Sequence, residues 1–183
     1  MMTRRWLSLA PVAALAAMVL ATPAAASLPV GATAPDFTAQ GARAGKTFGF
    51  ALKAALKKGP VVLYFYPKAF TQGCTLEAHA FAEASGDFVK AGATIIGMSA
   101  DDLPTLQRFS TEECRSKFAV ATATPEVVKA YDVAFKRPDG SVLPITSRTS
   151  YVIGRNGKIA MVHSDLDWRD HVRLTLEAVR KLR

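Results

Sequence analysis

The sequence predicts a single α/β domain in which helices cover both faces of a mixed β-sheet. Two observations carry this prediction. Residues 61–66 (VVLYFY) and 93–98 (ATIIGM) are unbroken apolar runs, which are typical of strands buried on both faces of a sheet. A stretch with helical periodicity follows each run, so strands and helices alternate along the chain.

The first half of the domain is built around the run at 61–66. Residues 47–50 are expected to form a short strand, and residues 51–58 a helix of one or two turns that ends at Gly59-Pro60. A longer helix is predicted over 74–90, because apolar residues recur there at helical spacing and Gly92 closes the segment.

The second half continues the alternation and ends with a hairpin and a helix. Asn156-Gly157 lies between the apolar runs 151–153 and 158–162, which is a strong signal for a β-hairpin. The remaining predicted elements are a helix over 103–113, a short strand over 118–121, a brief helix over 125–131 and an amphipathic helix over 168–182. This order, with a crossover before the hairpin, is the one expected of a thioredoxin-like fold.

The first 26 residues have the pattern of a secretory signal peptide. Arg4 and Arg5 precede an apolar run over 6–20, and Ala24-Ala25-Ala26 is a small-residue cleavage site. The run is shorter than the ~20 residues that span a bilayer, which argues against a membrane anchor. We therefore expect a mature domain over 27–183 that is periplasmic or secreted and has no stable membrane association. The choice between the general and the twin-arginine export route stays open.

Charge and cysteine content exclude several classes of protein. The formal net charge is +8, but lysines and arginines are scattered in runs no longer than two, which does not favour nucleic-acid binding. Two cysteines are too few for a disulfide scaffold, and no C-x-x-C motif is present. Two cysteines and three histidines also do not suggest a four-ligand structural zinc site, so no metal or cofactor is expected.

The stretch from Pro67 to Cys74 (PKAFTQGC) carries the chemically suggestive residues. Cys74 opens a predicted helix, where free amide groups and the helix dipole favour a thiolate. Gly73 allows the backbone to come close to a molecule that approaches the sulfur of Cys74. Thr71 supplies a hydroxyl group one short loop away from this sulfur. Pro67 fixes the exit from the strand. From these residues alone, a buried and inert cysteine is the more common interpretation.

The whole stretch resembles the P-x-x-x-T-x-x-C signature of the peroxiredoxins, which are thiol peroxidases that reduce hydroperoxides. Residues 31–37 (GATAPDF) are similar to the N-terminal G-x-x-A-P-D-F of that family, and residues 148–153 (RTSYVI) to its arginine-then-strand segment. The resemblance covers residues 29–182. Among the subfamilies the chain looks closest to the bacterioferritin comigratory protein (PrxQ) group.

The resemblance implies a role for each matching residue. Cys74 corresponds to the peroxidatic cysteine, which attacks the peroxide O–O bond and becomes a sulfenic acid. Thr71 corresponds to the hydroxyl group that binds the peroxide, and Pro67 to the shielding proline. Arg148 corresponds to the arginine that keeps the thiolate ionised. Glu77 stands where many relatives carry an acid or amide that orients this arginine, although an acid supporting the helix dipole is equally compatible.

The chain also departs from the family pattern. Gln72 replaces a common proline, and His79 stands where many PrxQ-like proteins carry their resolving cysteine. Cys114 is therefore the candidate resolving cysteine. Arg115 and Lys117 beside it would raise its thiolate fraction, although a solvated basic face explains these two residues equally well. The alternative is a one-cysteine enzyme in which Cys114 is a buried free thiol.

No function is assigned to the histidines. His79 is expected on a helix surface, His163 after a strand and His171 on the last helix.

Three other functions use the same residues. An exported thioredoxin-like copper-binding protein would employ Cys74 and His79, but the paired C-x-x-x-C of such proteins is missing. A disulfide oxidoreductase is disfavoured because C-x-x-C is absent. A peroxide sensor would use the chemistry of Cys74 and remains open.

The implied partners are a hydroperoxide and a thioredoxin-like or glutaredoxin-like thiol reductant, and the PrxQ resemblance implies a monomer.

Overall fold

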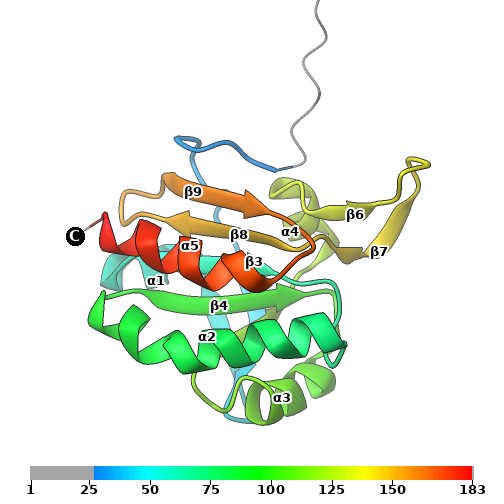
Figure 1. The fold of residues 1–183 in the computed structure, drawn as a ribbon, viewed down its shortest axis with the longest axis horizontal. Helices are drawn as coiled ribbons and strands as arrows, with labels where there is room; N and C mark the ends of the chain where they lie inside the picture. Colours follow the sequence, from blue (N-terminus) through cyan, green and yellow to red (C-terminus); the bar gives the residue numbers. More distant parts are fainter. Residues whose placement is uncertain (1–26, 183) are drawn as a thin grey trace, which may run out of the picture.

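The computed structural model describes residues 27–182, and the expected signal peptide lies outside these residues (Figure 1). Its strands are β1 (Thr38–Arg43), β2 (Lys46–Ala51), β3 (Val61–Phe65), β4 (Thr94–Ser99), β5 (Ala119–Thr122), β6 (Ala134–Lys136), β7 (Val142–Thr146), β8 (Thr149–Ile153) and β9 (Ile159–Ser164). Its helices are α1 (Leu52–Lys58), α2 (Gln72–Lys90), α3 (Leu103–Glu112), α4 (Pro125–Ala130) and α5 (Arg169–Arg180).

Seven strands form one mixed sheet in the order β2-β1-β5-β4-β3-β8-β9. β3, β4 and β5 are parallel to one another, whereas β8 pairs antiparallel with β3, and β1 pairs antiparallel with β5. The predicted thioredoxin-like α/β fold is thus confirmed. β6 and β7 form a separate two-stranded sheet.

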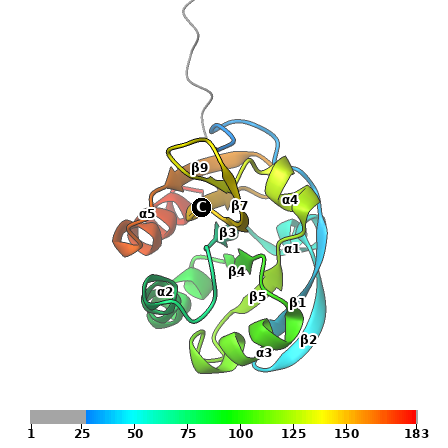
Figure 2. The ribbon, with the colours of Figure 1, turned by 90° about the vertical axis from the view of Figure 1, so that its right-hand side faces the viewer.

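Helices cover both faces of the sheet, as Figures 1 and 2 show. The alternation of side chains along β3 divides the core. Val62 and Tyr64 pack with residues of α2, α3 and α5, and the Tyr64 ring stacks on Phe81 of α2 at a centroid distance of 4.4 Å. Leu63 and Phe65 pack with residues of α1 and α4 on the other face. All five residues of β3 are buried, in agreement with its continuous apolar run.

Three strands were not predicted from the sequence. β1 (TAQGAR) contains small and polar residues instead of a β-branched run, and its pairing with β2 and β5 holds it in the sheet. β6 has only three residues, and β7 carries a proline, so neither has a clear strand signal. The segment expected to be only a crossover thus contains a β-hairpin.

The fold places the start of α2 directly beyond the end of β3. α2 begins at Gln72, two residues earlier than predicted, and Thr71 is its N-cap residue. Cys74 is therefore the third residue of the helix.

Within residues 27–182, no helix combines the length and the apolar character needed to cross a membrane.

Candidate active site

Cys74 is buried in the first turn of α2, with only 2% of its surface exposed. This turn presents amide N–H groups that no preceding helical residue can satisfy, so the local field favours a negative charge. Thr71 is exposed, and its hydroxyl group donates to the carbonyl of Lys68 at 2.9 Å instead of capping the helix. Pro67 is half-buried at the end of β3.

The loop that leads into α2 is held by an acid that the sequence did not suggest. Asp101 Oδ2 accepts from the backbone N–H of Ala69 and from the hydroxyl of Ser99, both at 2.8 Å. Phe70 has a positive φ of 62°, an unusual conformation for a bulky residue. Its ring contacts Phe109 of α3 edge-on. The loop conformation is therefore determined by contacts to β4 and α3.

Arg148 connects Cys74 with two other parts of the chain. Its Nη2 donates to Cys74 Sγ at 3.5 Å, its Nη1 contacts Glu77 Oε2, and its Nε donates to the carbonyl of Leu166 at 2.9 Å. Arg148 is only 5% exposed, although it lies 74 residues from Cys74 in sequence. Cys74, Glu77 and Arg148, three residues expected at the site, thus meet in one buried cluster.

Gly73 is required by this cluster, for a reason that differs from the expected one. A Cβ atom at Gly73 would lie 3.1 Å from Nη2 of Arg148 and 4.0 Å from Cδ1 of Trp168. The contact with the guanidinium would be tight, whereas the contact with the indole ring would be an ordinary one, so the glycine makes room for Arg148. Trp168 was not expected near the site.

Glu77 is fully buried within α2, whereas a residue that only supported the helix dipole would be exposed. Burial raises the pKa of Glu77 to about 8, against the opposite effect of Arg148. Its Oε2 contacts Arg148, whereas its Oε1 is buried and lacks a hydrogen-bond partner among the described residues.

His171 belongs to the same buried cluster, which the sequence did not reveal. Its Nδ1 lies 2.8 Å from Ser150 Oγ and 3.8 Å from Glu77 Oε1. Its Nε2 lies 3.0 Å from the carbonyl of Asp165. His171 is fully buried, and burial lowers its pKa to about 4, with further lowering by His163 and Arg148. The position of His171 on the polar-looking last helix gave no sign of this burial.

Comparison with known proteins decides the family. Residues 30–162 match the model of the AhpC/TSA family. The chain belongs to the AhpC/TSA family. It is 30% identical to a chloroplastic peroxiredoxin Q of Oryza sativa subsp. japonica, over 92% of this chain and 81% of that protein. These relationships support thiol-dependent peroxidase activity, so the predicted peroxiredoxin function is confirmed at this level.

Solved structures of the family agree with this fold. Peroxidoxin BcpB from Mycobacterium tuberculosis superimposes with a TM-score of 0.73 at 29% identity, over 84% of this chain and 97% of that one. The Xanthomonas campestris bacterioferritin comigratory protein, whose structures concern alkyl peroxide reduction, gives a TM-score of 0.68 at 25% identity. That match covers 78% of this chain and 90% of that one. The expected relation to the PrxQ group is therefore supported.

Cys114, the candidate resolving residue of this peroxiredoxin, is fully buried just beyond α3. Burial raises the pKa of Cys114 well above its ordinary value, and Glu113 adds to this shift. The expectation that Arg115 and Lys117 favour its thiolate is wrong, because both side chains are exposed and Arg115 pairs with Glu83 at 3.2 Å. Both cysteines are free thiols.

His79 of α2 pairs with Glu113 at 2.7 Å, which joins α2 to the end of α3. It is half-buried, and 29% of its side chain is exposed, so its expected position on the helix surface is confirmed.

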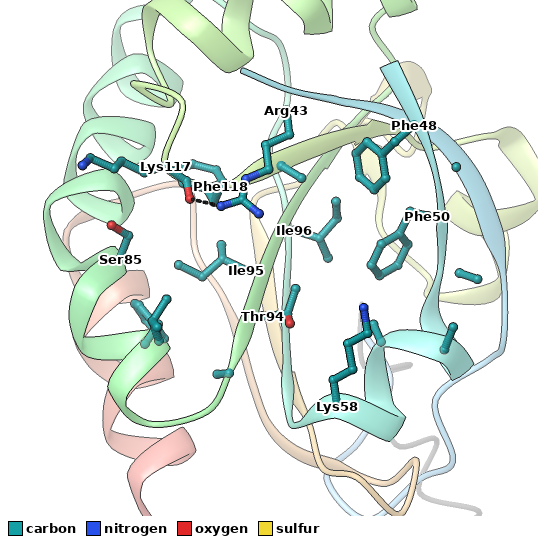
Figure 3. A pocket seen from close by; sticks show the side chains of 18 residues that line it. Arg43, Phe48, Phe50, Lys58, Ser85, Thr94, Ile95, Ile96, Lys117 and Phe118 are labelled. Atoms are coloured by element: carbon teal, nitrogen blue, oxygen red, sulfur yellow. Dashed lines mark hydrogen bonds between the residues drawn. The ribbon is translucent and has the colours of Figure 1, made fainter. Parts of the chain in front are cut away.

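A cavity of 440 Å³ lies away from Cys74 (Figure 3). Its walls include Phe48 and Phe50 of β2, Ile96 of β4 and the second half of α2 around Phe88. Phe88 follows Cys74 by fourteen positions, which is about 20 Å along a helix. None of the candidate site residues lines this cavity, so it is not a pocket around the Cys74 thiol.

Because His171 is buried, we expect the free energy of unfolding to fall in acid. An unfolded histidine titrates near 6.5, whereas His171 in the folded protein titrates near 4. Its contribution to stability is complete above about pH 6.5 and is lost as the pH falls towards 4, because the unfolded state then binds the extra proton. The loss is on the order of 3 kcal/mol.

Denaturant unfolding of the unsubstituted protein and of His171→Gln at several pH values measures this effect. The difference between their unfolding free energies should shrink as the pH falls through this window. A difference that is independent of pH would contradict the prediction.

Proposed function

We propose that Cys74 is the peroxidatic cysteine of a thiol-dependent peroxidase. The observation that carries the proposal is the buried contact of Arg148 with Cys74 Sγ at 3.5 Å, at the start of α2. A guanidinium group and free helix amides both favour the thiolate, which is the nucleophilic form of cysteine. A role of Cys74 as an inert core residue does not account for a buried arginine that donates to its sulfur atom.

The chemistry is a displacement at the peroxide O–O bond. The thiolate of Cys74 attacks the terminal oxygen of a hydroperoxide, a new S–O bond forms, and the O–O bond breaks. The leaving alkoxide or hydroxide takes up a proton to give an alcohol or water, and Cys74 becomes a sulfenic acid. Arg148 donates hydrogen bonds where negative charge develops. Thr71, by the family resemblance, binds the peroxide through its hydroxyl group, and Pro67 shields the site.

The proposed substrates are hydrogen peroxide and alkyl hydroperoxides. Exposed apolar residues belong to the segments that hold the site: Phe70 directly precedes Thr71 and is 37% exposed, and Leu166, whose carbonyl accepts from Arg148, is 59% exposed. Exposed apolar side chains of this kind are suited to the organic part of an alkyl hydroperoxide. The related Xanthomonas campestris protein, studied for alkyl peroxide reduction, supports this substrate class.

Cys114 is the proposed resolving cysteine. Its thiol attacks the sulfenic acid of Cys74, a disulfide forms and water leaves, and an external thiol reductant then restores both thiols. Both residues are buried in the same core cluster of the reduced protein. A disulfide requires their Cα atoms to lie within about 7 Å, so any wider separation has to be closed by movement of the first turn of α2 or the end of α3. Thr71 makes no side-chain cap to α2, which favours opening of that first turn. A one-cysteine enzyme or a peroxide sensor is the alternative.

The setting of this reaction is also part of the proposal. The signal-peptide pattern of residues 1–26 supports a periplasmic or secreted enzyme. A thioredoxin-like or glutaredoxin-like reductant of the same compartment would supply electrons. The resemblance to the PrxQ group supports a monomer.

Substitutions in the first turn of α2 test the assignment of the reacting thiol. Cys74→Ser should abolish peroxide consumption, and Thr71→Val should lower kcat/KM for hydrogen peroxide about a hundredfold, because the peroxide loses a hydrogen-bonding group. Thr71→Ser keeps the hydroxyl and is the matched control. Full activity in the Cys74 variant would overturn the mechanism, and equal rates for the two Thr71 variants would remove Thr71 from it.

Intact mass after one equivalent of hydrogen peroxide tests the role of Cys114. An intramolecular disulfide lowers the mass of the reduced protein by about 2 Da and consumes both thiols. Cys114→Ser should instead gain about 16 Da as a sulfenic acid. If the unsubstituted protein also gains this oxygen and keeps one free thiol, the enzyme uses a single cysteine.

A further inference from the structure

Glu77 has one carboxyl oxygen that its contacts leave unsatisfied. Oε2 contacts Arg148, but Oε1 is buried and lacks a hydrogen-bond partner among residues 27–182. A carboxylate oxygen without a donor is costly in a fully buried side chain. A proton on Oε1 removes this cost if an acceptor is within reach, because the protonated oxygen becomes a donor.

His171 presents such an acceptor. The carbonyl of Asp165 can only accept a hydrogen bond, so Nε2 of His171 carries the ring proton and donates to it at 3.0 Å. Nδ1 is therefore an acceptor. The Ser150 hydroxyl donates to it at 2.8 Å, and Glu77 Oε1 lies 3.8 Å from it. The Ser150 hydroxyl can rotate away, and a shift of about 1 Å brings Oε1–H into hydrogen-bond range.

The other titratable groups around His171 do not compete for this role. His163 of β9 packs its ring against His171 at a centroid distance of 4.5 Å, and Asp165 offers its backbone carbonyl. Arg148 is a permanent cation that contacts the other oxygen of Glu77.

We propose that His171 is a positioning residue that holds a proton on Glu77 through an Oε1–H···Nδ1 hydrogen bond, and so keeps the charge of Arg148 available to the Cys74 thiolate. This inference rests on the proposed role of Cys74 as the reacting thiol. Glu77 then orients the guanidinium as a neutral acid. The raised pKa of Glu77 and the lowered pKa of His171 agree with a proton that stays on the carboxyl group.

The charge balance of the cluster explains why the proton matters. When Glu77 is neutral and Cys74 is ionised, one buried cation faces one buried anion. When Glu77 is also ionised, Arg148 must serve two buried anions, and the second charge is left only partly compensated. A proton held by the Glu77–His171 pair therefore favours the thiolate of Cys74.

Thiolate titrations by ultraviolet absorbance test the proposal in a Cys114→Ser background, where Cys74 is the only thiol. His171→Gln removes the acceptor at the Nδ1 position, whereas His171→Asn can place an amide oxygen there. We expect His171→Gln to move the titration of Cys74 upwards by about one pH unit and to slow peroxide reduction about tenfold at neutral pH. His171→Asn should recover most of this loss. His79→Gln is the control and should not move the titration, because His79 lies on α2 with Cys74 but pairs with Glu113.

The effect of His171 must also depend on Glu77. In a Glu77→Gln background, where no carboxyl proton exists, adding His171→Gln should cause no further shift of the Cys74 titration. In the infrared spectrum at neutral pH, the band of a protonated carboxylic acid should be present and should disappear in Glu77→Gln.

Three results would overturn the inference. They are an unchanged Cys74 titration in His171→Gln, a shift of the same size in both Glu77 backgrounds, or the absence of the carboxylic acid band. A general loss of structure would lower activity equally at every pH and would not be recovered by His171→Asn. Failure of the proposed function is a separate outcome, because the unsubstituted Cys74 would then not react with peroxide at all.

Discussion

The buried guanidinium of Arg148 is the interaction on which the rest of the site depends. It contacts α2 through Cys74 and Glu77 and the segment before α5 through the carbonyl of Leu166. A buried arginine is tolerated only when its donors are satisfied and its charge is matched. The fold meets this requirement by placing the residue before β8 against the first turn of α2, which is the consequence of pairing β8 with the central strand β3.

The need to accommodate the buried Arg148 also determines which residues surround it. A side chain at Gly73 would press against Nη2 of Arg148. His171 is buried where it packs beside Glu77 and Ser150. A cluster of this kind gains little stability from its ion pairs, since desolvation offsets the attraction. It does place a fixed positive charge beside the Cys74 sulfur, as the proposed reaction through a thiolate requires. The polar cluster is thus explained by peroxide reduction better than by folding.

Sequence and resemblance were sufficient for the central strands, for α2 and for Cys74, because these have strong local patterns. The position of Arg148 beside Cys74 followed only from the family resemblance, since no local pattern brings together residues 74 positions apart. His171, Asp101 and Trp168 were missed for a similar reason. Each lies on a polar or loop segment, and each acquires its role from tertiary packing. The favourable environment expected for the Cys114 thiol was wrong, because local basic residues said nothing about its burial.

The most direct test of the account is the rate at which Cys74 is oxidised when Arg148 is changed. Trp168 is the only tryptophan in residues 27–183 and lies beside Gly73, so its fluorescence can report the reaction in a stopped-flow experiment. Arg148→Lys should lower the second-order rate constant for hydrogen peroxide by about a hundredfold, because lysine cannot reproduce the guanidinium contacts. Arg155→Lys, at an exposed site, should react like the unsubstituted protein. Equal rate constants for both variants would contradict the central role of Arg148.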